Sequence, residues 1–80
     1  MDDLCLYYQP FCPYCIRVLN FMRIRGIEIE LRDTAIPENR ARLVEVGGKA
    51  QVPCLFIGDT PMYESNDIMR YLGDRFHCSI

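Results

Sequence analysis

Apolar and polar positions change period along this chain, and each period predicts an element of secondary structure. Residues 4–8 are apolar on both faces, as expected of a central strand in a sheet that is covered on both sides. Residues 13–25 follow a helical period, since at steps of about 100° a set of side chains shares one arc: Cys15, Val18, Leu19 and Met22. Pro13 suits the first helical position, where its missing N–H costs nothing. The start of the chain therefore predicts a buried strand followed by an amphipathic helix.

The middle of the chain predicts an edge strand and a second helix. Residues 27–32 alternate apolar and charged side chains, which is typical of a strand with one face in water at the edge of a sheet. Residues 37–46 predict a helix, and Gly47 with Gly48 supplies the signal that ends it.

The last part of the chain predicts a hairpin followed by a third helix. Residues 52–57 form an apolar run that predicts a strand, and Gly58-Asp59 is a two-residue turn signal leading into residues 61–63. Ser65 is a preferred N-cap residue, and apolar side chains follow it at helical spacing: Ile68, Tyr71, Leu72 and Phe76.

The predicted order of elements is β-α-β-α-β-β-α. A right-handed crossover makes the first two strands parallel, and the third strand follows a second crossover. The hairpin then adds an antiparallel fourth strand. We therefore expect an α/β fold, with a mixed four-stranded sheet and helices on both of its faces.

Length and charge limit what the protein can be. Eighty residues, half of them hydrophobic, suffice for one domain over residues 1–80. The net charge of −2 argues against a nucleic-acid surface, which needs a basic stripe, and the apolar stretches are too short to span a membrane. The acidic start, Met1-Asp2-Asp3, is unlike a secretory signal. We expect a cytoplasmic protein without nucleic-acid or membrane partners.

Two cysteines carry the clearest chemical signal. Cys12 and Cys15 lie between the predicted first strand and the predicted first helix, and this context favours a redox pair. Unpaired N–H groups at a helix N-terminus favour negative charge, so thiols there have pKa values of roughly 3.5–7.5 instead of about 8.5. The helical arc places Cys15 toward the core, while Cys12 is at the exposed tip. The two thiols are therefore predicted to be chemically unequal.

The remaining cysteines are less informative. Five cysteines cannot all pair within one chain, and without a secretory signal a catalytic or metal role outranks a disulfide framework. Cys5 and Cys54 are interpreted as small strand residues, with Cys54 also a possible secondary thiol near the redox pair. Cys78 and His77 lie near the C-terminus, and His77 is assigned no role.

Cys12-Pro13-Tyr14-Cys15, in this order of elements, resembles the glutaredoxin family of the thioredoxin fold. C-P-Y-C is typical of the dithiol members, whereas thioredoxins usually carry Gly-Pro between the cysteines. Gln51-Val52-Pro53 is similar to the family's T-V-P segment, and Glu64-Ser65-Asn66-Asp67 to its G-G-x-D-D segment. The resemblance covers nearly the whole chain and implies a thioredoxin-like fold.

The resemblance also implies a chemistry for the cysteine pair. Cys12 would be the nucleophile, whose thiolate attacks a glutathionylated protein or a disulfide. Cys15 would resolve mixed disulfides by internal attack and could be dispensable in a monothiol route. Tyr14 would shape the cleft or donate a hydrogen bond. The implied activity is a glutathione-dependent thiol–disulfide oxidoreductase, with glutathione as co-substrate and no permanently bound cofactor or metal.

A glutathione site follows from the same resemblance. Pro53 would be cis, and the backbone of Val52 would pair with the cysteinyl part of glutathione. Backbone N–H groups of Ser65 and Asn66 would receive the γ-glutamyl carboxylate at a helix start, and Asp67 would pair with the ammonium group.

One charged group of the family pattern is missing. Gln9 stands where many glutaredoxins have a lysine three residues before the first cysteine. Arg40, on the predicted second helix, is our choice for the glycyl carboxylate, with Gln9 as a neutral donor. Lys49 and Arg17 are weaker candidates.

Other functions stay open at this point. The E-S pair and Tyr71-Leu72 also resemble the glutathione-binding domain of glutathione transferases, which suggests a redox-inert glutathione-binding module, although both cysteines are present. Some glutaredoxins carry a [2Fe–2S] cluster between two subunits, against which Pro13 and Tyr14 argue. A redoxin dependent on thioredoxin reductase is the remaining alternative. The expected partners are glutathione and disulfide-containing or glutathionylated proteins, and the expected state is a monomer.

Overall fold

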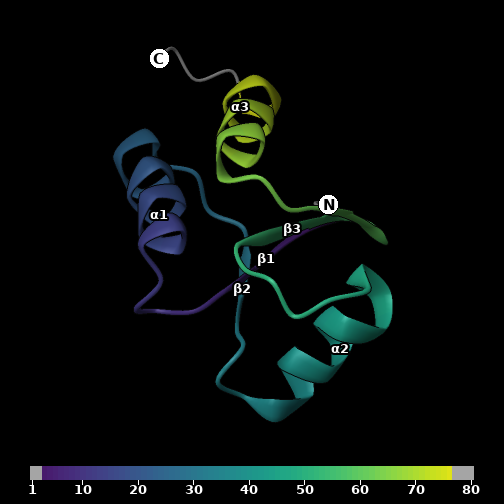
Figure 1. Cartoon of the computed structure of the whole chain (residues 1–80). Helices are drawn as coiled ribbons and strands as arrows, with labels where there is room; N and C mark the ends of the chain where they lie inside the picture. The colour runs from purple at the N-terminus through teal and green to yellow at the C-terminus, as the bar shows by residue number, and fades with distance from the viewer. Residues whose placement is uncertain (1–2, 77–80) are drawn as a thin grey trace.

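The computed structural model describes residues 3–76, so the interpretations of His77 and Cys78 lie outside the described residues. The chain forms the predicted order of elements (Figure 1). Their bounds are β1 Leu4–Tyr8, α1 Pro13–Arg25, β2 Glu30–Asp33, α2 Pro37–Gly47, β3 Cys54–Ile57, β4 Thr60–Met62 and α3 Ser65–Arg75. None of the helices over residues 3–76 is long and apolar enough to cross a membrane.

The strands form one four-stranded mixed sheet in the order β2-β1-β3-β4. β1 is parallel to β2, whereas β3 is antiparallel to both β1 and β4. Gly58, at φ 62°, makes the turn between β3 and β4, which is the left-handed conformation that glycine adopts without steric cost. The predicted α/β class, the mixed sheet and the edge position of β2 are confirmed.

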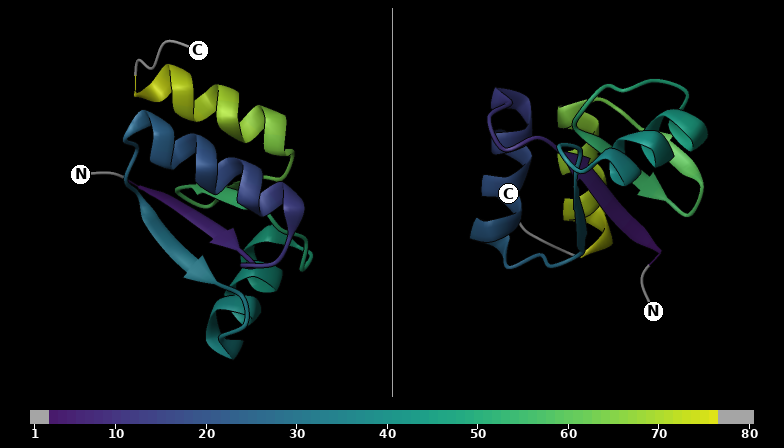
Figure 2. Two further views of the ribbon diagram at one scale, coloured as in Figure 1. Left: turned by 90° about the vertical axis from the view of Figure 1, so that its left-hand side faces the viewer. Right: turned by 90° about the horizontal axis from the view of Figure 1, so that it is seen from below.

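Helices cover both faces of the sheet, as predicted. Figures 1 and 2 show α1 and α3 side by side on one face and α2 on the other. The two-residue period of β1 sends Leu4 and Leu6 toward α1 and α3, and Tyr7 toward α2. The larger core cluster contains Leu4, Leu6, Val18, Met22, Ile27, Leu55, Ile68 and Leu72, and the smaller one contains Tyr7, Leu43, Cys54 and Phe56.

Two strands begin later than the sequence predicts. The strand predicted at residue 27 starts at Glu30, because Ile27 is buried at the end of α1 and its N–H donates to the Met22 carbonyl at 2.8 Å. The strand predicted at residue 52 starts at Cys54, because Pro53 has no N–H to give to a ladder. Residues 52–53 form a bend instead.

The N-cap of α3 was also wrongly predicted. Glu64, not Ser65, is the N-cap residue, and its side chain makes no capping hydrogen bond. The first helical bond runs from the Ile68 N–H to the Glu64 carbonyl at 2.8 Å, which makes Ser65 the first residue of the helix. Similarly, α2 includes Gly47 and is ended by Gly48, at φ 91°. Ser65 therefore offers a backbone N–H in the first turn of α3, where such groups have no partner within the helix.

Candidate active site

Cys12 is the N-cap residue of α1, in the short loop that leaves β1. Its backbone is extended, and its N–H donates to the Gln9 carbonyl at 3.2 Å, which closes a turn over residues 9–12. Pro13 then occupies the first helical position as predicted, and the Ile16 N–H donates to the Cys12 carbonyl at 2.9 Å. The Cys12 side chain is half-buried, so the sulfur lies at the start of α1 with access to solvent.

The surroundings of Cys12 stabilise its thiolate. As a thiol the side chain makes no capping hydrogen bond. Burial raises its pKa, but the thiolate accepts hydrogen bonds from the Cys15 backbone N–H, the Cys15 thiol and the Tyr14 backbone N–H, and together these outweigh the burial. The pKa of Cys12 therefore lies below its ordinary value of 9.0. This is the direction that the position at a helix start predicts.

Cys15 is the opposite case. Its side chain is 0% exposed, on the inner face of α1, and the Gln9 N–H donates to its sulfur at 3.5 Å. Burial, the largest effect, raises the pKa of Cys15 to about 12; the Gln9 hydrogen bond lowers it, and the neighbouring Cys12 sulfur raises it again. The predicted inequality of the two thiols is confirmed: one is accessible and acidic, the other sheltered and protonated.

Alkylation of the reduced protein by iodoacetamide should separate the two thiols. At pH 7 Cys12 should react much faster than Cys15, because its pKa is lowered and its sulfur is accessible, whereas Cys15 is buried and its pKa is raised to about 12. The rate at Cys12 should rise with a midpoint below pH 9.0. Rates at each site are read by peptide mass spectrometry between pH 4 and pH 10, with the fully unfolded protein as control. A midpoint at or above that of the unfolded protein would contradict this picture.

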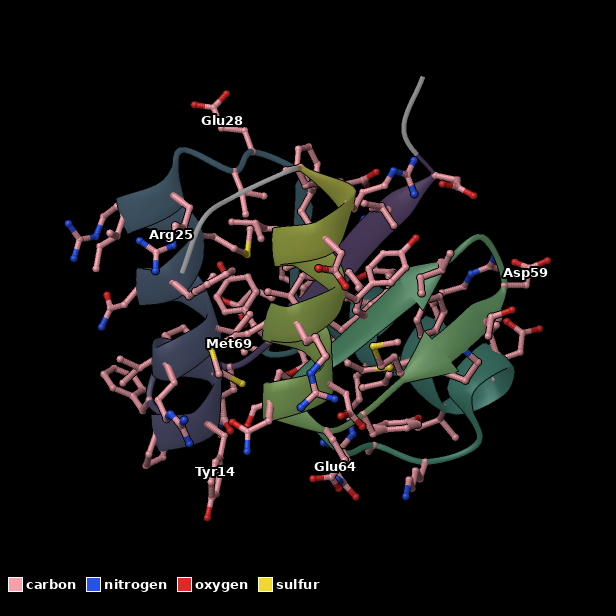
Figure 3. All side chains as sticks on the ribbon, turned by 90° about the horizontal axis from the view of Figure 1, so that it is seen from above. Tyr14, Arg25, Glu28, Asp59, Glu64 and Met69 are labelled. Atoms are coloured by element: carbon pink, nitrogen blue, oxygen red, sulfur yellow. The ribbon has the colours of Figure 1, made fainter. Side chains whose placement is uncertain are left out.

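A cleft of about 250 Å³ opens next to Tyr14, the residue that precedes Cys15. It is lined by residues from three parts of the chain: Tyr14, Gln51, Val52, Pro53, Tyr63, Glu64 and Ser65. The Val52–Pro53 peptide bond is cis, as the resemblance predicts. Figure 3 shows Tyr14 and Glu64 pointing out at the same end of the molecule. The cleft has an exposed ring on one side and the start of α3 on the other.

The structure brings part of the predicted site together. Tyr14, Val52, Pro53 and Ser65 line the cleft, and Cys12 and Cys15, which do not line it, lie on either side of Tyr14 in the sequence. The other predicted residues do not line it: Gln9, Arg40, Asn66 and Asp67. The Asn66 side-chain oxygen accepts a hydrogen bond from the Arg17 guanidinium at 3.2 Å, and Asp67 lies 3.7 Å from the Arg70 guanidinium.

Three lining residues were not among the predicted site residues. Gln51 and Glu64 belong to the two segments that resemble the glutaredoxin motifs. Their positions next to Val52 and Ser65 in the sequence could therefore have predicted that they line the cleft. No sequence signal pointed to Tyr63, because only the fold shows that its ring lines the cleft. The Lys49 ammonium lies 4.6 Å from the centre of this ring, which places a positive charge beside one wall of the cleft.

The other described cysteines stand apart from this chemistry. Cys5 and Cys54 are free thiols, and burial raises the pKa of each to about 11. Cys54, the first residue of β3, is 0% exposed and packs as a small core residue.

Comparison with known proteins identifies the family. The chain is 33% identical over 72 residues to a glutaredoxin of Neisseria meningitidis, a match that covers 88% of this chain and 85% of the relative. A glutaredoxin of Pseudomonas aeruginosa is 32% identical over 69 residues, covering 85% and 82%. The chain belongs to the glutaredoxin family. The predicted family is thus confirmed, and with it a glutathione-related redox protein.

A transferase relationship is also present in this glutaredoxin. Residues 6–78 match the family model described as glutathione S-transferase, N-terminal domain, so the chain belongs to that family of domains too. Glutathione transferase Omega 3C from Trametes versicolor superposes with a TM-score of 0.80 at 26% identity, covering 96% of this chain. The chain spans only 35% of that transferase.

Two further structures settle the fold. A mutant of the thioredoxin-like protein BC3987 superposes with a TM-score of 0.78 at 21% identity and covers 99% of this chain and 100% of its own. The glutaredoxin of Archaeoglobus fulgidus gives a TM-score of 0.70 at 21% identity, covering 92% and 85%. At these identities the likeness concerns the fold, which confirms the predicted thioredoxin-like architecture.

Proposed function

We propose that this glutaredoxin is a glutathione-dependent thiol–disulfide oxidoreductase that reduces glutathione mixed disulfides and protein disulfides. One observation carries the proposal. Cys12 has a lowered pKa and access to solvent, and Tyr14, two residues after it, lines a cleft that ends at the first turn of α3. A nucleophilic sulfur and a place for a peptide-like co-substrate therefore lie next to each other.

The proposed reaction has two exchange steps at Cys12. In the first, the Cys12 thiolate attacks the glutathione sulfur of a mixed disulfide; a Cys12–glutathione disulfide forms, and the substrate leaves as a thiolate that takes a proton from water. In the second, the thiolate of another glutathione attacks the glutathione sulfur on Cys12. Oxidised glutathione leaves, and Cys12 returns as a thiolate. One free glutathione is consumed in each cycle: its sulfur is oxidised and leaves joined to the glutathione sulfur of the substrate, while the other substrate sulfur is reduced to a thiol.

Cys15 has a narrower role in this scheme. It would attack Cys12 when the bound partner is a protein, forming the internal disulfide and releasing the reduced partner. Burial holds the pKa of Cys15 high, so its thiolate is scarce. The repulsion from the Cys12 thiolate ends once Cys12 is in a disulfide, but the burial remains. With small glutathionylated substrates, free glutathione should therefore attack the Cys12–glutathione disulfide faster than Cys15 does.

Glutathione would lie along the cleft with its γ-glutamyl end at α3. The N–H groups of Ser65 and Asn66 are in the first turn of that helix and favour a carboxylate. The ammonium group would meet a carboxylate at the same helix start, with Asp67 as the proposed partner. The backbone of Val52 would pair with the cysteinyl part, which directs the glutathione sulfur toward Cys12.

A coupled assay tests the proposed activity. The substrate is a mixed disulfide between glutathione and a short peptide, with reduced glutathione, glutathione reductase and NADPH present. NADPH oxidation should depend on the protein and on glutathione. A matched assay replaces glutathione and its reductase by thioredoxin reductase and should give no turnover. Turnover in the second assay alone, or in neither, would reject the proposal.

Replacing Arg40 by alanine tests the proposed partner of the glycyl carboxylate. Arg40 lies outside the cleft, so this contact requires the glycyl end of glutathione to extend beyond the cleft to α2. Loss of that exposed charge-assisted contact should raise the KM for glutathione roughly three- to tenfold and leave kcat nearly unchanged. Arg42→Ala is the matched control, because Arg42 is on the same helix and its exposed side chain faces Asp59 at 3.8 Å. An unchanged KM in Arg40→Ala would remove Arg40 from the site and direct attention to Lys49.

A further inference from the structure

The Tyr63 hydroxyl crosses from the segment between β4 and α3 to the end of α2. Its oxygen lies 2.9 Å from the Gly47 carbonyl oxygen and 3.1 Å from the Lys49 carbonyl oxygen. The single hydroxyl proton can be donated to either carbonyl, and the Cys54 sulfur is a third neighbour of the hydroxyl, which lowers the pKa of Cys54 by a hydrogen bond. Tyr63 therefore joins two parts of the chain that are 16 and 14 residues away from it in sequence.

The carbonyl groups at this place need a donor. The last carbonyls of a helix have no partner within it, and the Gly48 N–H serves only the Val44 carbonyl, at 3.0 Å. Tyr63 supplies the donor for Gly47, the last residue of α2. The fit is close, because a Cβ built on Gly47 would fall far inside the contact distance of the Tyr63 hydroxyl. We call this hydrogen-bonded, closely packed contact between Gly47 and Tyr63 the joint.

This joint lies at the beginning of the segment that leads into the cleft. Residues 48–52 connect α2 to the cis proline, and the segment supplies Gln51 and Val52 to the cleft wall. Within residues 3–76, no backbone-to-backbone hydrogen bond involves residues 49–52. The Tyr63 hydroxyl is thus the contact that anchors the Lys49 backbone, while the start of β3 holds the other end.

We propose that Tyr63 is a positioning residue for glutathione recognition, which holds residues 48–52 so that the Val52 backbone meets the co-substrate. The inference rests on the proposed glutathione-dependent activity. Tyr63 acts through the segment it anchors, and takes no part in the exchange of disulfide bonds at Cys12. Its loss should weaken binding and leave the chemistry intact.

Tyr63→Phe isolates the hydroxyl, since the ring that faces Lys49 and lines the cleft is kept. The KM for glutathione mixed disulfide should rise about fivefold, the effect of one lost hydrogen bond, and kcat should stay within about twofold. Amide hydrogen exchange should accelerate for residues 48–52 and stay unchanged in β1. Tyr71→Phe is the matched control: it removes a hydroxyl that accepts a hydrogen bond from Arg75 at 2.9 Å, away from the cleft, and should change neither reading.

Gly47→Ala in two backgrounds tests the joint itself. In the natural background the new methyl group meets the Tyr63 hydroxyl, so the unfolding temperature should fall by about 5 °C and the KM should rise. In Tyr63→Phe the hydroxyl is gone, and alanine is the better helix former. The same substitution should then leave the unfolding temperature unchanged or raise it.

The outcomes separate the two proposals. An unchanged KM in Tyr63→Phe, or a fall in kcat alone, overturns the positioning role while the wild-type activity stands. Equal effects of Gly47→Ala in both backgrounds, or unchanged exchange of residues 48–52, overturn the joint without any activity measurement. Absence of glutathione-dependent turnover in the wild type rejects the proposed function instead.

Discussion

Replacing Cys12 by serine should reduce turnover of a glutathione mixed disulfide by roughly a thousandfold or more, to near the uncatalysed rate. A serine hydroxyl is not ionised near neutral pH and cannot form the disulfide intermediate. The fold should survive, because serine is a preferred N-cap residue and Cys12 occupies the N-cap position of α1. The loss would therefore report chemistry and not unfolding.

Cys15→Ser is the matched control for this result. It makes the same atomic change one helical turn away, at a buried sulfur with a raised pKa. Glutathione should still complete the cycle at Cys12, so at least roughly a tenth of the turnover should remain on the peptide mixed disulfide. Reduction of a protein disulfide should fall further, since internal attack is lost. The measurement is the glutathione-coupled assay on both variants, with circular dichroism to confirm folding.

The two variants give opposite results if the proposed roles are right. Activity that survives in Cys12→Ser would overturn the role of Cys12 as nucleophile. Loss of all activity in both variants would reject the monothiol route and make the internal disulfide obligatory. Cys12 as nucleophile would stand in that case, and Cys15 would become equally necessary.

Leu6→Ala should produce the largest change in stability. Leu6 is 0% exposed in the central strand β1, where it is paired with Leu31 of β2 and Leu55 of β3. Truncation of such a leucine leaves a cavity and costs about 2–5 kcal/mol. The free energy of unfolding of a chain of this length is about 4–12 kcal/mol, so the loss is a large fraction of the total.

Urea denaturation followed by circular dichroism measures this effect. The midpoint should fall sharply in Leu6→Ala while the slope with urea stays similar. Ile24→Ala is the control, because Ile24 is 67% exposed on α1 and its truncation should cost less than about 0.5 kcal/mol. Equal losses in the two variants would mean that β1 is not the centre of the core.

Strand β1 contributes both to the hydrophobic core and to the position of the reactive cysteine. β1 carries the core through Leu4 and Leu6 on one face and Tyr7 on the other, and the loop that follows it delivers Cys12 to the start of α1. A buried strand is a rigid support for the loop that carries the half-buried sulfur of Cys12. The burial of Cys15 follows from the same packing, and this burial makes the two thiols unequal.

The amino-acid sequence by itself determined the order of elements, the mixed sheet, the family and the inequality of the cysteines. These features depend on local periods and on motifs within short stretches, such as the arc that contains Cys15. The starts of β2 and β3 could not be predicted from the apolar pattern. Ile27 forms a hydrogen bond with the end of α1, and Pro53 lies in the bend that precedes β3. At Ile27 a contact outside the strand overrides the apolar pattern, and at Pro53 the missing N–H does so.

Only the tertiary structure decided which residues form the cleft. It brought Tyr63 and Gln51 to the wall that Val52 and Ser65 share, and it left Arg40 outside. Periodicity describes neighbours along one element, whereas a cleft is made where separate elements meet. The contact between Tyr63 and Gly47 joins residues that are 16 positions apart, and its acceptor is a backbone carbonyl at a helix end. Every residue has such a carbonyl, so no pattern of side chains could predict this contact.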